Sequence, residues 1–505
     1  VLLKGIGREF MSHGFNEARV KVAHPYLTMM GLFLGAFTGM FSETSLNIAI
    51  PQLGAAFGVD TAITQWLVVG YMLVIGLVMP FAGILMKWFS VRKITLGALG
   101  AFFVGSLISG FAPTFDVLLV GRLIQGIGTG LILPVMFAVV LEVFPPCKIG
   151  AAMGIAALII MFAPAVGPTL SGIMLGVFSW RAIFFSFAFV LAIAMVFAAK
   201  TLVNPYELTR PVVDGLSCVL SCIGFGGLVL GAGMASLYGW ASAQVIVPLA
   251  CGIVALALYA RRQVSIKVPV VDVRVFSLRG FRVGAAGVML NFGITLSAMF
   301  LLPQFIQNAM GIPVAMTGII MLPGGIVNAA VSMAAGRLYD RVGARIPARV
   351  GFALSIVGAL MLLVAPVTCS VAYVIAAHIV LMVGVPLAMS PCQTSALNSL
   401  PPRLSADGST ALNTLQQVLG AIATAVATSM LGLGQASYYA AHGASAADAF
   451  ANGCHWGFAF TLVLAVCGLA VAFMLKKRAE KTDVVPEIEP HEMKACAPAQ
   501  PAVEQ

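Results

Sequence analysis

The sequence predicts an all-helical protein that crosses a lipid bilayer many times. Of its 505 residues, 60% are hydrophobic and only 9% are charged, whereas a soluble chain carries roughly a quarter charged residues. Apolar runs of the ~20 residues needed to cross a ~30 Å hydrocarbon core recur along almost the whole chain. Such runs satisfy their backbone hydrogen bonds in lipid by forming helices.

Fourteen runs are predicted to span the membrane. They lie at residues 26–50, 64–85, 94–112, 115–141, 149–177, 180–199, 215–236, 243–260, 283–304, 313–335, 346–366, 370–392, 409–434 and 453–475. The first run is too long, and too polar at its end, for a cleavable signal peptide, so we expect a permanent span.

Lys and Arg residues predict the orientation of the spans. With the N-terminus in the cytoplasm, nearly all of the 28 Lys and Arg residues fall on the cytoplasmic side, as membrane topology favours. Both termini are therefore expected there: a cytoplasmic segment at 1–25 and a Pro- and charge-rich tail at 476–505, predicted to be disordered. The net charge of +10 reflects this asymmetry and does not indicate a nucleic-acid partner.

An internal repeat predicts how the spans are grouped. The segment "GRLYDRVGAR" at 336 follows the tenth span as "GILMKWFSVRK" at 83 follows the second, an offset of 253, and Gly384 matches Gly128 at an offset of 256. This spacing predicts two related six-helix bundles separated by an additional central pair of helices. The predicted domains are a bundle at 26–199, the additional pair at 200–262, a basic cytoplasmic linker at 263–282 and a bundle at 283–475.

Three ionisable residues fall well inside predicted spans: Glu43, Arg122 and His378. Charges inside a membrane are costly, so function is the default hypothesis. Glu43 and Arg122 each lie seven residues from the outer end of their span, roughly 10 Å deep at 1.5 Å per residue. We expect them to neutralise each other directly or through Gln125, one helical turn from Arg122. A proton-coupling site is favoured over a permanent structural ion pair.

His378 occupies the position of Arg122 in the repeat and is a further candidate for proton coupling, although a lone histidine can be a hydrogen-bonded core residue. Other polar side chains in or near spans are candidates for a substrate cavity, although each amide can equally hold helices together. These candidates are Asn47, Gln65, Tyr71, Gln125, Asn291, Gln304, Asn413 and Gln416.

The sequence lacks the patterns of several other classes. It shows no metal-ligand cluster, no paired carboxylates, no nucleophile with its base and no nucleotide-binding P-loop. We therefore expect no enzyme activity and no cofactor. A membrane sensor or a structural partner remains an alternative of another class.

Four motifs make the chain resemble the major facilitator superfamily. The specific resemblance is to the fourteen-helix drug:proton antiporter branch of EmrB/QacA type, and to its lincomycin-exporter-like subgroup. In the fourth span, "LLVGRLIQGIGTG" is similar to the branch's motif B, whose arginine, Arg122 here, is implicated in proton coupling. The resemblance implies a major facilitator fold with two extra helices.

The fifth span resembles the antiporter motif of this branch. Proline removes a backbone donor and kinks a helix, and small residues let a neighbouring backbone approach closely. The resemblance implies that this element seals the pathway and favours exchange; the alternative is a static kink. The matching residues are Gly154, Ala163, Pro164, Gly167, Pro168, Ser171 and Gly172.

Motif A of the family is a turn that latches helices at the cytoplasmic face, and it is intact only after the tenth span. The candidate gate residues are Gly336, Asp340, Arg341, Gly343 and Arg345 in the second copy and Gly83, Arg92 and Lys93 in the first. In the first copy Lys87 replaces the acid and Ser90 replaces the second glycine. A solvated charge run is the alternative interpretation.

The first span departs from the branch pattern at one position. The branch places an acid where Ser42 stands, and here the acid is displaced to Glu43. One residue is a 100° turn on a helix, so the carboxylate is free to face a different neighbour.

The resemblance implies a proton-coupled multidrug efflux antiporter in the plasma membrane of a bacterium. It would export lipophilic neutral or monocationic compounds by alternating access, with the proton as coupling ion and membrane lipids around it; an adaptor subunit is left undetermined. A second buried acid, which a dication would favour, is absent from the predicted spans. The rival within transport is an exporter or exchanger of an endogenous lipid or metabolite.

Overall fold

The computed structural model describes residues 24–144, 146–202, 214–266, 269–401, 404–442 and 446–475. Every regular element within these ranges is helical. Most of the predicted cytoplasmic N-terminal segment and the predicted tail lie outside the described residues, as does part of the segment that joins the first bundle to the additional pair.

The first group of helices packs around α2. Helix α2 contacts α8, α9 and α10, while α7 packs against α8 and α10, and α5 packs against α8. We call this group the first half. Its elements are α2 (Pro25–Ser45), η1 (Leu46–Ile48), α3 (Ile50–Phe57), α4 (Thr61–Thr64), α5 (Trp66–Val78), η2 (Met79–Phe81), α6 (Ala82–Trp88), α7 (Val91–Gly110), α8 (Phe115–Val143), α9 (Pro146–Val177) and α10 (Arg181–Thr201).

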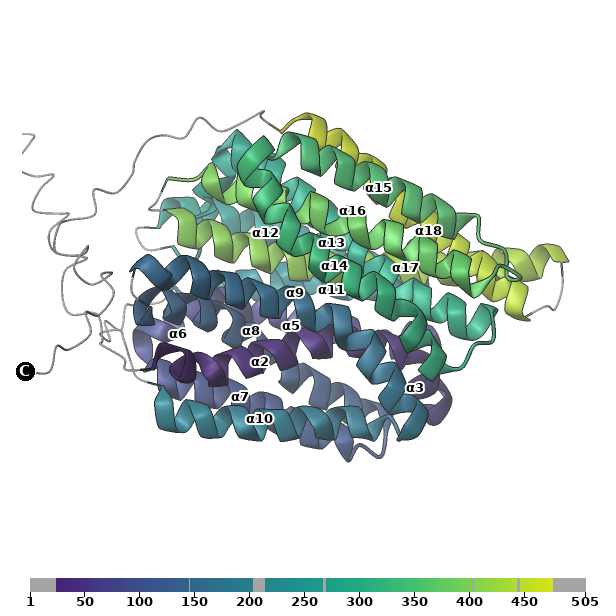
Figure 1. The fold of residues 1–505 in the computed structure, drawn as a ribbon, viewed down its shortest axis with the longest axis horizontal. Helices are drawn as coiled ribbons and strands as arrows, with labels where there is room; N and C mark the ends of the chain where they lie inside the picture. Colours follow the sequence, from purple (N-terminus) through teal and green to yellow (C-terminus); the bar gives the residue numbers. More distant parts are fainter. Residues whose placement is uncertain are drawn as a thin grey trace, which may run out of the picture.

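The second group packs in the same manner around α13, which contacts α16, α17 and α18. We call it the second half. Its elements are α13 (Arg279–Gln304), the π-helical turn η4 (Phe305–Ala309), α14 (Val314–Val342), α15 (Arg345–Leu363), α16 (Val371–Asn398), α17 (Ser405–His442) and α18 (Ala446–Phe473). Between the halves lie α11 (Gly215–Tyr238), α12 (Ala243–Ser265) and the short η3 (Val273–Ser277). Figure 1 shows the two halves one above the other.

The number of spans differs from the predicted fourteen. Among the described residues, 12 helices are long and apolar enough to cross a membrane, or up to 13 if the bent pair in α9 forms one span. Helix α2 is not among them, although its 21 residues cover most of the first predicted span. Its last turns carry Ser42, Glu43, Thr44 and Ser45, which lower its hydropathy.

Close contacts repeat between the halves with the offsets seen in the sequence. A Cβ added at Gly105 of α7 would lie 2.8 Å from the backbone nitrogen of Gln125, and one added at Gly358 of α15 would lie 2.7 Å from that of Leu381. Gly358 follows Gly105 by 253 residues, and Leu381 follows Gln125 by 256 residues. The missing Cβ atoms let corresponding helices approach equally closely in both halves.

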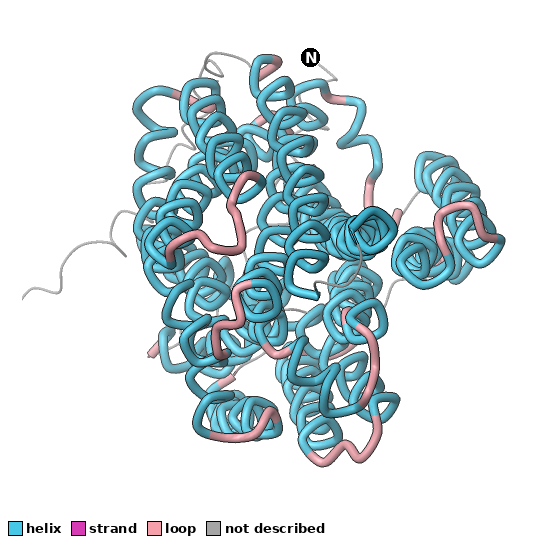
Figure 2. The backbone as a smooth tube through the Cα atoms, turned by 90° about the vertical axis from the view of Figure 1, so that its right-hand side faces the viewer, coloured by secondary structure: helices cyan, strands magenta, loops and turns pink. Residues whose placement is uncertain are grey.

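The halves meet along two seams, α9 against α14 and α5 against α17. The additional pair lines the second seam, because α11 contacts both α5 and α17. Figure 2 shows this pair set to one side of the two bundles. At this seam Gln65 Nε2 donates to Ser236 Oγ at 2.7 Å, and the Trp66 ring fills the space beside Gly233.

Candidate functional site

Arg122 lies in α8 with 0% of its surface exposed, and its guanidinium is held by an organised set of acceptors. Nε donates to the Leu67 carbonyl at 3.0 Å, and Nη1 donates to Ser42 Oγ at 2.6 Å and to Gln125 Oε1 at 2.7 Å. A buried cation is tolerable only when its donors are satisfied in this way. The predicted contact between Arg122 and Gln125 is present in the structure.

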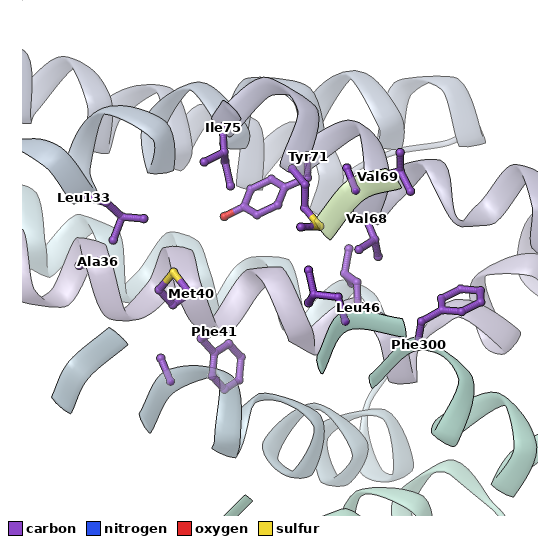
Figure 3. Packing of buried hydrophobic residues seen from close by; sticks show 14 of the residues in the cluster. Ala36, Met40, Phe41, Leu46, Val68, Val69, Tyr71, Ile75, Leu133 and Phe300 are labelled. Carbon is purple, nitrogen blue, oxygen red and sulfur yellow. The ribbon is translucent and has the colours of Figure 1, made fainter. Parts of the chain in front are cut away.

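Tyr71 of α5 completes the surroundings of the guanidinium. The Arg122 Cζ lies 3.9 Å from the centroid of the Tyr71 ring, an arrangement in which the ring quadrupole attracts the cation. The Tyr71 hydroxyl donates to the Gly39 carbonyl at 2.9 Å and lies 2.7 Å from Thr129 Oγ1. Figure 3 shows this ring between α5 and α2. Tyr71 is therefore part of the arginine pocket, and its hydroxyl is already committed within the protein.

The Glu43 carboxyl faces the second half of the molecule. It is 1% exposed, and Gln417 of α17 is its polar neighbour in the second half. Glu43 Oε2 and Gln417 Oε1 are both without a hydrogen-bond partner in the protein. No ion pair within 4.0 Å joins Glu43 to Arg122, both of which the structure describes. The expected direct neutralisation is thus absent, although the two charges still interact through space.

The register of α2 explains this separation. Ser42, at the position where the branch pattern has its acid, points at Arg122, with its hydroxyl and its carbonyl both accepting from the guanidinium. Glu43 follows by one residue and is turned by 100° around the helix. This turn of α2 therefore contacts Arg122 of the first half through Ser42, while Glu43 of the same turn is directed toward the second half.

The buried amides fall into two classes by hydrogen bonding. Gln125 is fully bonded, because its Nε2 donates to Ser106 Oγ at 2.9 Å while its Oε1 accepts from Arg122. The other buried amides of the two halves leave at least one buried atom without a hydrogen-bond partner in the protein: Asn47 Oδ1, Gln65 Oε1, Asn291 Oδ1 and Nδ2, Gln304 Nε2, Gln416 Nε2 and Gln417 Oε1. Asn413 is half-buried, with its Nδ2 3.5 Å from Ser409 Oγ. Each such buried atom costs about 1–3 kcal/mol unless a ligand or water satisfies it.

His378 lies in α16 and is buried without a hydrogen-bond partner. It is 2% exposed, and neither ring nitrogen has a hydrogen-bond partner in the protein. Its ring packs on Gly324 of α14, where an added Cβ would lie 2.3 Å from Nδ1. Tyr71 and Gly324 are separated by 253 residues, so the second half has a glycine where the first has the aromatic platform for Arg122.

The kink in α9 is linked to α2. The segments Leu158–Pro164 and Val166–Val177 are bent by 40° relative to each other. Pro168 has no N–H, which leaves the carbonyl four residues earlier without its helical donor. Thr44 Oγ1 donates to that carbonyl, of Pro164, at 3.2 Å. Residue 44 follows Glu43 directly, so the break in α9 is fixed beside the buried acid.

The small residues of the antiporter motif lie at the seams of α9. An added Cβ at Gly167 would lie 2.3 Å from Thr44 Oγ1, and one at Gly172 would lie 2.8 Å from the Cα of Gly318 in α14. Thr169 Oγ1 donates to the Gly318 carbonyl at 3.0 Å. Ala163 and Ser171 are 0% exposed. Gly154 lies within α9.

The candidate gate residues surround the turns that follow α6 and α14. Gly343 has a φ of 77°, which favours glycine, and ends α14. Arg92 donates to the Ala199 carbonyl of α10, and the Lys93 backbone N–H donates to Ser90 Oγ. Gly83, Gly336, Arg341 and Arg345 lie in or beside these turns, whereas the side chain of Asp340 lies outside the described residues.

Comparison with known proteins identifies the family. The family model described as Major Facilitator Superfamily matches residues 32–425. The chain belongs to the major facilitator superfamily. It is 40% identical over 472 residues to the lincomycin resistance protein LmrB of Bacillus subtilis, covering 91% of this chain and 98% of that protein. It is 39% identical over 457 residues to LmrB of Listeria monocytogenes, covering 90% and 97%.

A more distant relative and a solved structure agree with membership of the major facilitator superfamily. The multidrug resistance protein Stp of Mycobacterium tuberculosis is 28% identical and covers 80% of this chain and 75% of that protein. A crystal structure of a POT family transporter in complex with 5-aminolevulinic acid shares the fold, with a TM-score of 0.64 at 14% identity, covering 88% of this chain and 94% of that chain. The protein is thus a multi-pass membrane transporter by family and fold, and not an enzyme.

Three residues of this facilitator site were not assigned their roles from the sequence. Ser42 binds Arg122, Thr44 binds the Pro164 carbonyl, and Gln417 contacts Glu43. The polar run "FSETS" was a usable signal for the first two, since consecutive polar residues on a helix face several neighbours. The approach of Gln417 to Glu43 depends on how the two halves pack, which no local pattern indicates.

Proposed function

We propose that this protein is a proton-coupled antiporter that exports lipophilic neutral or monocationic drugs by alternating access. The observation that carries the proposal is the position of Glu43: a buried carboxyl in the first half whose polar neighbour is Gln417 of the second half and whose Oε2 has no hydrogen-bond partner in the protein. Similarity to lincomycin and multidrug resistance proteins supports drugs as the cargo. The seams and the kinked α9 supply surfaces on which the halves can move.

Protonation of Glu43 changes the contact between the halves. As a carboxylate it attracts the amide N–H groups of Gln417 across this contact, and an interaction of an amide with a charged group is stronger than one between neutral groups. Protonation of Glu43 weakens this interaction and removes the electrostatic attraction between Glu43 and Arg122. Arg122 itself stays in place, because Ser42, Leu67 and Gln125 accept its hydrogen bonds. Arg122 therefore acts as a fixed positive charge beneath the acid. Occupancy by a proton or by a substrate favours different arrangements of the halves, which couples their movements.

The proposed arrangement in the membrane has fourteen spans, with α2 and the bent α9 both crossing and both termini in the cytoplasm of a bacterium. The first and second halves move as bundles at 26–199 and 283–475. The pair at 200–262 and the linker at 263–282 connect them. The motif A residues form the cytoplasmic gate in this arrangement, and His378 is a second candidate site for a proton.

Transport in proteoliposomes tests the proposal. Purified protein is reconstituted, a pH gradient is imposed, and movement of lincomycin and of the monocation tetraphenylphosphonium is followed. We expect uphill movement of substrate against the flow of protons, and its loss in Glu43→Gln. Glu142→Gln, at the end of α8, is the matched control and is expected to keep coupling. Transport that ignores the gradient would refute proton coupling, and movement of only a lipid or metabolite would favour the rival cargo.

A further inference from the structure

Two unpartnered amide atoms belong to two elements that pack on each other, one from each half. Asn47 belongs to η1 of the first half and is 1% exposed; Gln304 is the last residue of α13 in the second half and is 0% exposed. Asn47 Oδ1 is an acceptor and Gln304 Nε2 a donor, and neither has a partner in the protein. Elements η1 and α13 pack directly on each other.

Neighbouring contacts fix this place in the fold. Gln307 Nε2 donates to the carbonyl of Ile48, next to Asn47, at 3.0 Å, and so joins the two halves. Asn308 Nδ2 donates to Gln304 Oε1 at 2.9 Å, which orients the Gln304 amide and leaves its Nε2 free. In Figure 3, Phe300, one helical turn before Gln304, is seen near Leu46 of η1.

We propose that Asn47 and Gln304 form a subsite for a hydroxyl group of the substrate. A hydroxyl both donates and accepts, so one group can donate to Asn47 Oδ1 and accept from Gln304 Nε2, and thereby bridge the halves. The inference rests on the proposed export function and adds a specificity to it. Substrates with a hydroxyl use this subsite, whereas lipophilic cations without hydrogen-bonding groups bind elsewhere in the pathway.

Another buried amide provides the matched control. Gln263 of α12 is also 0% exposed, but its Nε2 donates to Ser217 Oγ and its Oε1 accepts from the Val270 backbone N–H, both at 2.7 Å. Replacing this amide therefore removes a structural bond and no part of the proposed subsite. A general effect of losing a buried amide appears in both variants, and a specific effect appears only at the subsite.

Export kinetics with two probes test the subsite. Lincomycin carries several hydroxyl groups, and tetraphenylphosphonium carries no hydrogen-bonding group. In Gln304→Met and Asn47→Leu we expect the KM for lincomycin to rise about 5- to 10-fold, which corresponds to one ordinary hydrogen bond. The KM for tetraphenylphosphonium should change less than about twofold, within the range of small context effects. Gln263→Met should leave the ratio of the two KM values unchanged.

The possible failures can be told apart. Equal changes for both probes, or an unchanged lincomycin KM in a variant that elutes as folded protein, would overturn the subsite alone. If Gln304→Met does not fold, Asn47→Leu decides on the same criteria. A wild type that exports neither probe would overturn the proposed function and the subsite with it.

Discussion

The Thr44 hydroxyl of α2 donates to the Pro164 carbonyl of α9 at 3.2 Å, replacing the backbone donor that Pro168 cannot supply. The antiporter motif is thus more than a kinked helix with small residues. The carbonyl that Pro168 leaves without a helical donor is bonded by Thr44, the residue after Glu43. A movement of α9 and protonation of Glu43 therefore act on the same turn of α2.

The Thr44 contact predicts a specific loss. Thr44→Val leaves the half-buried Pro164 carbonyl without this donor, which costs about 1 kcal/mol, the lower end of the range for buried groups, and thermal unfolding in detergent should show it. Thr44→Ser keeps the donor and should lie close to wild type. Thr38→Val is the control on the same helix, because the Thr38 hydroxyl bonds only to the Leu34 carbonyl, at 2.8 Å. Equal losses at positions 38 and 44 would contradict the role of the kink.

Close packing at the α9–α14 seam leads to a second prediction. Gly172→Ala places a Cβ where it would lie 2.8 Å from Gly318 Cα, and such overpacking costs about 1–3 kcal/mol. We expect lower stability and slower transport. Gly100→Ala in α7 meets no atom within 4 Å and should be neutral or gain up to about 1 kcal/mol from helix propensity. Normal transport in Gly172→Ala would show that the seam tolerates separation.

The arginine pocket predicts that charge alone is insufficient at position 122. Lysine keeps the charge but not the planar set of donors, so Arg122→Lys leaves the Leu67, Ser42 and Gln125 acceptors incompletely satisfied. A hydrogen bond to a charged group contributes about 1.5–3 kcal/mol, and we expect transport to be largely lost. Tyr71→Phe keeps the ring under the cation and should retain more activity. The order of these two variants in an efflux assay checks the account.

The additional helix pair predicts a pH-dependent stability. Arg262 of α12 donates to both carboxylate oxygens of Asp214, at 2.6 and 2.8 Å, and these bonds hold the pKa of Asp214 below its ordinary value. Because the folded-state pKa is depressed, the contribution is present above ~3.9, the pKa in the unfolded chain, and is lost as the pH falls through the folded-state value.

Asp214→Asn should therefore lower the melting temperature at pH 7, and its difference from wild type should shrink as the pH falls below about 4. Asp116→Asn, in the exposed first turn of α8, is the control and should show little difference at either pH. A gap for Asp214→Asn that stays constant across the pH range would refute the contribution of the ion pair.

The sequence predicted the membrane class, the related halves and the contact of Arg122 with Gln125, because hydropathy, repeat offsets and helical spacing are local properties of the chain. It did not predict the direct surroundings of Glu43. Whether residue 42 or residue 43 faces Arg122 depends on the rotation of α2, which packing against α8, α9 and α10 determines. The partner of Glu43 is more than 370 residues away in the chain, and no local pattern links it to α2.

The most direct test of the central claim is proton release on substrate binding. Tetraphenylphosphonium is added to the detergent-solubilised protein in weakly buffered solution, between about pH 5 and 8, and the released protons are counted with a pH indicator. We expect release by the wild type at some pH in this range and none by Glu43→Gln, with binding itself retained. Equal release by the two proteins would contradict the account, because the proton would then reside on another group.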